Sequence, residues 1–61
     1  MALDKIDHAL LLALQKDGRA SIANLAEAVS LTETPCARRL KRLEAEGYID
    51  GYRTILSRSA L

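Results

Sequence analysis

The 61-residue chain contains no Trp or Phe, and it has only two Tyr, one Pro and one Cys. Its core must therefore come from Leu, Ile, Val and Ala, a mixture that favours helices. A single cysteine cannot form an internal disulfide, and no run approaches the roughly 20 apolar residues that span a bilayer. These absences predict a small, mainly helical protein of the cytoplasm that has no membrane partner.

An excess of charge of one sign is also missing, since nine Lys and Arg stand against eight Asp and Glu. Strongly electrostatic nucleic-acid binders are usually far more basic. The distribution is uneven, because three cations oppose four acids in residues 1–29 and six oppose four in residues 30–61. Four of those six cations lie close together, at Arg38, Arg39, Lys41 and Arg42. The basic character of the chain is thus concentrated in one short segment.

Apolar residues recur at helical spacing near the start of the chain, which predicts a first helix over residues 4–16. Asp4 is suited to cap the amino end, and Asp7 adds negative charge at the positive pole of the helix dipole. Gly18 is expected to close the helix in the left-handed conformation. The two aspartates are therefore interpreted as helix-start residues rather than as a paired acid and base.

Two further apolar stripes predict two more helices. The second helix is expected after Ser21, whose hydroxyl accepts from a backbone N–H, and it should end at about Ser30. A helix of about two turns is marginal alone, so its neighbours must hold it by packing. The third helix is expected to begin at a Thr32 or Thr34 cap and to end at Gly47.

The composition changes after Gly47, where residues 48–56 combine β-branched and aromatic residues with an Asp-Gly pair. This pattern suits a short β-strand or hairpin, which would form a wing beside the helices. Residues 57–61 show no pattern of their own. They are interpreted as the start of a linker to a C-terminal domain that is missing here.

A helix of two turns, a short turn and a basic third helix make up the helix-turn-helix arrangement. Ala26 falls where the two helices of this unit cross and only a small side chain fits, and apolar residues fill its core positions at Leu25, Val29, Leu31 and Cys36. The prediction is a mainly all-α fold, a three-helix winged helix-turn-helix with a short C-terminal β-strand or hairpin. Its domain covers residues 1–56.

When the apolar stripe of the third helix faces inward, a basic face points outward, as expected for a helix that enters the major groove. Arg38 suits a two-pronged contact with guanine, Thr34 and Ala37 suit a thymine methyl or a phosphate, and Lys41 and Arg42 suit phosphates. The residues predicted to bind double-stranded DNA are Thr32, Glu33, Thr34, Ala37, Arg38, Arg39, Lys41 and Arg42.

Arg39 lies nearer the core edge of this helix than the other cations. Two roles fit that position. Arg39 either contacts a backbone phosphate or braces the domain through Glu27 or Asp50, and the sequence leaves both roles open.

Four groups of residues agree in order and spacing with a known family. They are Leu3-Asp4-x-x-Asp7, Leu10-Leu11-x-x-Leu14-Gln15-x-Asp17-Gly18-Arg19, Thr34-Pro35-Cys36-x-x-Arg39-Leu40-x-x-Leu43-Glu44-x-x-Gly47-x-Ile49, and Gly51-Tyr52. With these motifs the chain resembles, over essentially all its length, the amino-terminal domain of leucine-responsive (Lrp/AsnC) transcriptional regulators of prokaryotes.

The resemblance implies a sequence-specific, winged DNA-binding domain joined by a strand-like linker to a ligand-sensing αβ domain. That second domain would assemble homodimers or higher homo-oligomers and respond to amino acids. The chain departs from the family pattern at two positions. Ser30 replaces the usual glycine of a turn that favours positive φ, and Arg38 replaces a residue that is commonly acidic or polar.

Two interpretations are possible for each of several other residues. Cys36 is either a redox sensor or a small buried residue, and its place on the apolar stripe favours burial. His8 has no second His or Cys to share a metal, which favours a surface histidine. Tyr48 and Tyr52 either stack on bases or pack in the core or the seam between wing and third helix, and packing is favoured.

Two functions of different classes remain after these interpretations. The favoured one is DNA binding, and the rival is a winged-helix module that binds another protein through the third helix or the wing, for which a nearly neutral charge leaves room. No Ser, Cys or Lys lies in a recognisable catalytic motif, so we expect no enzyme, no cofactor and no metal.

Overall fold

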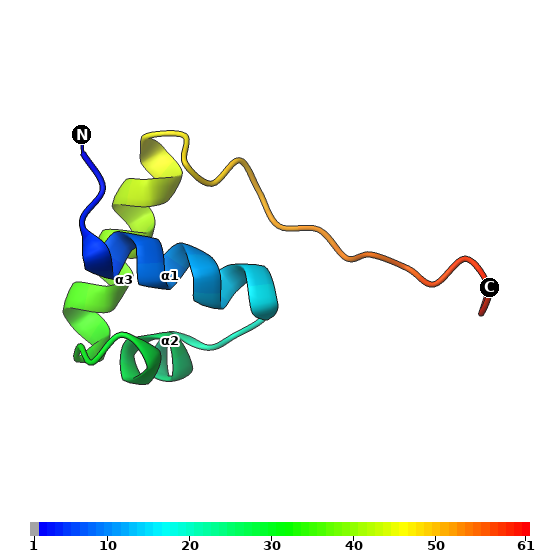
Figure 1. Ribbon diagram of the computed structural model, residues 1–61, viewed down its shortest axis with the longest axis horizontal. Helices are drawn as coiled ribbons and strands as arrows, with labels where there is room; N and C mark the ends of the chain where they lie inside the picture. Colours follow the sequence, from blue (N-terminus) through cyan, green and yellow to red (C-terminus); the bar gives the residue numbers. More distant parts are fainter. Residues whose placement is uncertain (1) are drawn as a thin grey trace.

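The computed structural model describes residues 2–61 and contains three helices, α1 (Lys5–Lys16), α2 (Ile22–Ala28) and α3 (Glu33–Ala45). The helices lie in the predicted places, with ends that differ by one to a few residues. Figure 1 shows α1 and α2 one above the other, with α3 crossing beside the amino end of α1. Residue 1, the first of the predicted domain, lies outside the described residues. Within residues 2–61, no helix is both long and apolar enough to cross a membrane.

The amino end of α1 is held by two aspartates, as predicted. The Asp4 Oδ1 atom accepts a hydrogen bond from the Asp7 backbone N–H at 2.8 Å, and Asp7 Oδ2 accepts one from the Asp4 N–H at 3.2 Å. This reciprocal capping box satisfies two N–H groups that have no partner within the helix.

The carboxyl end of α1 differs from the prediction, because Gly18 does not adopt the left-handed conformation. The chain leaves the helix instead through Asp17, which has an extended backbone with φ −148°. The Asp17 side chain accepts from the Arg19 N–H at 3.0 Å, and its carbonyl accepts from the Ala20 N–H at 3.2 Å. These bonds form a turn that makes a left-handed glycine unnecessary.

The core lies where the three helices meet and contains no aromatic side chain. Its buried members are Leu10 from α1, Leu25 and Ala26 from α2, Val29 after it, and Cys36 and Leu43 from α3. Ala26 is only 3% exposed, which confirms the small residue expected where the two helices cross. Leu31 is partly buried and packs against this cluster. The short α2 is therefore held by tertiary packing, as its length requires.

Helix α2 ends two residues earlier than predicted, because Ser30 has a left-handed backbone with φ 59°. The Leu31 N–H donates to the Ala26 carbonyl at 2.9 Å, and the Ser30 N–H donates to the Glu27 carbonyl at 3.2 Å. This is the Schellman pattern of helix termination. The same pattern closes α3 at Gly47, whose φ is 82°. Ser30 thus occupies a conformation that favours glycine, as the departure from the family pattern predicted.

Substitution of Ser30 by glycine is expected to stabilise the domain by about 0.5–1 kcal/mol, because the removed left-handed strain exceeds the extra entropy of glycine in the unfolded chain. Urea unfolding followed by circular dichroism measures the change. Ser57→Gly is the matched control, since Ser57 is exposed and lacks positive φ, and it should give no gain. A Ser30→Gly domain no more stable than the unmodified chain would contradict the strain.

The C-terminal segment leaves the three helices as an extended tail (Figure 1). The β-strand or hairpin predicted over residues 48–56 does not form, and the described chain contains no strand. A strand needs a partner for its backbone groups, and residues 50–56 make no backbone hydrogen bond to any other described residue. Ile55 is 91% exposed, so side-chain packing does not replace the missing partner.

The two tyrosines are more exposed than predicted, at 44% for Tyr48 and 50% for Tyr52. Neither belongs to the core. The predicted seam between wing and third helix does not form either, but the Tyr52 hydroxyl donates to Glu44 Oε2 at 2.8 Å and so connects the tail to α3. Burial raises the pKa of Tyr52 to about 12, with a further contribution from the hydrogen bond to Glu44.

Candidate nucleic-acid interface

Helix α3 presents most of its polar side chains to solvent. Exposed residues on α3 or directly before it include Thr32, Glu33, Thr34, Arg38, Lys41 and Arg42, whereas Ala37 and Arg39 are partly buried. Buried Cys36 and Leu43 fix the opposite side of the helix in the core. The structure therefore brings the predicted site residues together on one helix, with Arg39 at the margin of the exposed face.

Three cations of this face remain available to a partner. Within the described chain, Arg38, Lys41 and Arg42 take part in no ion pair. Glu44, a possible counterion on the same helix, accepts a hydrogen bond from Tyr52 instead. Within the described chain, the exposed face of α3 thus carries three cations that no carboxylate binds directly.

The amino end of α3 follows the turn after α2. Thr32 has the extended backbone of a capping residue, with φ −77° and ψ 166°, but its side chain makes no capping hydrogen bond. Of the two residues predicted as caps, Thr32 therefore occupies the capping position of α3, but its hydroxyl does not accept a hydrogen bond from the helix. Thr34 and Pro35 lie in the first turn, where proline removes no intrahelical hydrogen bond.

Arg39 is held by the amino end of α1. Its Nη1 atom donates to Asp4 Oδ1 and Oδ2 at 2.8 and 2.7 Å and to Asp7 Oδ1 at 3.1 Å. The prediction that Arg39 braces the domain through Glu27 or Asp50 was wrong in its partners. Arg39 instead binds the carboxylates of Asp4 and Asp7 at the start of α1. The sequence correctly predicted Asp4 as the cap of α1 and Asp7 as a negative charge at its start, but it did not predict this second role of the two aspartates. The signal available in the sequence was the place of Arg39 near the core edge of the helix, away from the other cations.

Residues 3–50 match the family described as winged helix-turn-helix DNA-binding. The chain belongs to this family. The leucine-responsive regulatory proteins of Escherichia coli K12 and Salmonella typhimurium are each 49% identical to it over 55 residues, which are 90% of this chain and 34% of those proteins. The chain therefore spans about a third of the length of these curated relatives.

Solved structures agree with the sequence comparison. A transcriptional regulator from Neisseria meningitidis, crystallised with L-Met, superposes with a TM-score of 0.94 at 42% identity, over 97% of this chain and 38% of that one. An AsnC family regulator from Agrobacterium tumefaciens gives a TM-score of 0.90 at 34% identity, over 95% and 38%. The resemblance of this winged helix-turn-helix domain to Lrp/AsnC regulators is confirmed.

The link between α1 and α3 alters the ionisation of its members. The hydrogen bond from Arg39 is the main reason that the pKa of Asp4 falls from 3.8 to about 2, and the capping bond from the Asp7 N–H adds to the shift. The same hydrogen bond to Asp4 raises the pKa of Arg39 above its ordinary value. Asp4 is thus charged at every pH at which the domain would bind DNA.

Acid should weaken this link over a defined range. Because the pKa of folded Asp4 is about 2 against an ordinary 3.8, its charge stabilises the domain fully above about pH 4, and that contribution is lost as the pH falls through about 2. We expect the unmodified chain to be more stable than Asp4→Asn at about pH 5, with a smaller difference at about pH 2. Urea unfolding measures the difference in the free energy of unfolding at each pH. The same difference at both pH values would contradict a stabilising link between Arg39 and charged Asp4.

The structure also places the two other residues considered for chemistry, Cys36 and His8. Cys36 is fully buried, as favoured from the sequence, and burial raises the pKa of its thiol, which disfavours the reactive thiolate. His8 is exposed. Within the described residues, no three His, Cys, Asp or Glu side chains gather where they could hold a metal ion.

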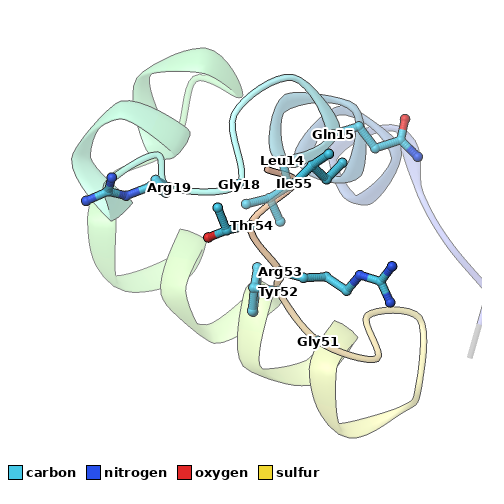
Figure 2. A pocket seen from close by; sticks show the side chains of 9 residues that line it. All are labelled: Leu14, Gln15, Gly18, Arg19, Gly51, Tyr52, Arg53, Thr54 and Ile55. Atoms are coloured by element: carbon cyan, nitrogen blue, oxygen red, sulfur yellow. The ribbon is translucent and has the colours of Figure 1, made fainter. Parts of the chain in front are cut away.

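A shallow hollow of about 480 Å³ lies between the end of α1 and the tail. Figure 2 shows that the side chains of Arg19 and Arg53, which help to line it, point in opposite directions. The two guanidinium groups therefore do not converge on a common ligand. The exposed face of α3 is the better candidate for the functional site of this winged helix-turn-helix domain.

Proposed function

We propose that this domain binds double-stranded DNA in a sequence-specific manner by inserting α3 into the major groove, as part of a prokaryotic transcriptional regulator. The observation that carries the proposal is the group of three exposed cations without ion-pair partners, Arg38, Lys41 and Arg42, on the third helix of a helix-turn-helix. The chain acts as a binding domain and not as an enzyme.

Each residue of the site has a distinct part in this proposal. Arg38 reads guanine through a two-pronged contact, and Thr34 and Ala37 meet a thymine methyl or a phosphate. Lys41 and Arg42 bind phosphates and hold the helix in register. Thr32 and Glu33 line the amino end of α3, which enters the groove first.

The complete regulator is proposed to act in the cytoplasm as a homodimer or higher homo-oligomer. Residues 57–61 begin a linker to a C-terminal domain that senses an amino acid, since the matched relatives are about three times as long and one of them was crystallised with L-Met. The segment 49–56, which forms no strand in the described chain, becomes a strand by pairing with a second chain, and this strand forms the wing of the domain. Two domains would then bind half-sites about one helical turn apart.

Salt separates DNA binding from the rival protein-interaction function. The two cations on phosphates, Lys41 and Arg42, should weaken binding of a short duplex about 12-fold between 50 and 200 mM salt, since each phosphate contact contributes about 0.9 to the logarithmic slope. Fluorescence anisotropy with a labelled duplex measures this dependence. Nearly constant affinity over that range would contradict groove binding by the basic face and favour an apolar protein interface.

A further inference from the structure

We propose that Arg39 is a positioning residue rather than a DNA contact: Asp4 and Asp7 hold it so that it fixes the rotation of α3 against α1. The orientation of α3 then determines where Arg38 lies in the groove. The inference rests on the proposed DNA-binding function, and it assigns Asp4 and Asp7 a part in sequence recognition although neither belongs to the helix-turn-helix.

The geometry of the three side chains favours a fixed link. A single atom, Arg39 Nη1, lies within 3.1 Å of oxygens from both aspartates, which are 35 and 32 residues away in sequence. The Asp7 side chain is only 1% exposed and that of Arg39 only 25%. The same carboxylates also accept the capping bonds of α1. The guanidinium is therefore anchored to groups that are themselves fixed.

Charge argues against a phosphate at this place. Two carboxylates lie beside one guanidinium, so the cluster has a net charge of −1. A phosphate that approached Arg39 would be repelled by Asp4, whose side chain is 52% exposed. Arg38, Lys41 and Arg42 form no ion pair within the described chain. Arg39 is thus the least suitable of the four cations for the DNA backbone.

Packing in the core fixes the distance between α3 and α1, but it fixes the rotation of α3 about its own axis less well. Apolar contacts at Cys36 and Leu43 are non-directional, whereas the hydrogen bonds of Arg39 have defined directions. The side chains of a helix lie about 5–6 Å from its axis, so a rotation of 10° moves them by about 1 Å. A two-pronged contact from Arg38 to guanine does not tolerate that displacement.

The test compares Arg39→Met with Lys41→Met, a control that removes the same charge from the same helix. Two duplexes are used: one selected from a random pool by the unmodified 61-residue chain, and one of scrambled sequence. We expect Arg39→Met to weaken binding of the selected duplex about tenfold while affinity for the scrambled duplex and the salt slope stay unchanged. Lys41→Met should weaken both duplexes alike and reduce the salt slope by about one.

Asp4→Asn is the second variant, because Arg39→Met leaves the buried Asp7 carboxylate unpaired and is at risk of unfolding. Asparagine keeps the capping oxygen and removes the charge. In folded protein, verified by circular dichroism, this variant should bind the selected duplex at least threefold less tightly relative to the scrambled one.

A salt slope that falls by about one in Arg39→Met would overturn the proposal and make Arg39 a phosphate contact. Unchanged preference between the duplexes in both folded variants would also overturn it and leave the link a purely stabilising one. If the unmodified chain selected no duplex from the random pool, the proposed DNA-binding function itself would fail, and this result is distinct from any effect of the variants.

Discussion

Replacement of Arg38 and Lys41 together by alanine is expected to weaken binding of the preferred duplex by about 10- to 1000-fold. Loss of a two-pronged arginine contact with guanine costs about 1–3 kcal/mol, and loss of a phosphate contact adds a smaller, salt-dependent part. Both side chains are exposed, so their removal leaves the core intact. Fluorescence anisotropy at fixed salt measures the loss, and circular dichroism should show unchanged helix content.

The matched control is Lys5→Ala with Arg58→Ala. These two exposed cations lie outside α3, and their loss changes the net charge from +1 to −1, as the first pair does. If binding depended on net charge alone, the two double variants would behave alike. We expect the control to lose less than about threefold in affinity, and equal losses would contradict a site on α3.

Truncation of Leu43 to alanine is expected to leave little folded protein at 25 °C. Leu43 is completely buried at the point where α3 meets the core, and a buried Leu→Ala substitution costs about 2–5 kcal/mol. A domain of this size has a total stability of only about 3–5 kcal/mol. The substitution therefore removes most of the free energy that holds α3 in place, and thermal unfolding should show a midpoint lower by about 10–40 °C.

Leu12→Ala provides the control for this experiment. Leu12 lies on α1 and is 60% exposed, so the same chemical change should alter the free energy of unfolding by less than about 0.5 kcal/mol. A Leu43→Ala domain as stable as the Leu12→Ala domain would show that the core described above does not hold α3.

The features predicted well from the sequence depend on neighbours in the chain. The capping box at Asp4 joins residues three positions apart, and the left-handed turn at Ser30 depends on the adjacent end of α2. The burial of Cys36 follows from the period of a single helix. In each case the physical cause acts over one turn of helix, where a pattern in the sequence reports it directly.

The features on which the sequence and the structure disagree depend on contacts between residues that are not neighbours in the chain. Arg39 meets Asp4 across 35 positions, and only the crossing of α1 and α3 brings them together. The strand expected over residues 48–56 has the right composition, but strand formation requires a backbone partner that the described residues do not supply. The composition of a segment indicates its capacity to form a strand, whereas formation of the strand also requires a partner strand.

The binding of DNA by the exposed face of α3 is tested most directly by titrating isotope-labelled protein with a short duplex and following its backbone amide signals at low and moderate salt. We expect the largest shifts from Thr32 to Arg42 and their suppression by added salt. Lys5 and His8, exposed on α1, should stay nearly unchanged. Undisturbed α3 signals at millimolar duplex would contradict DNA binding by this face.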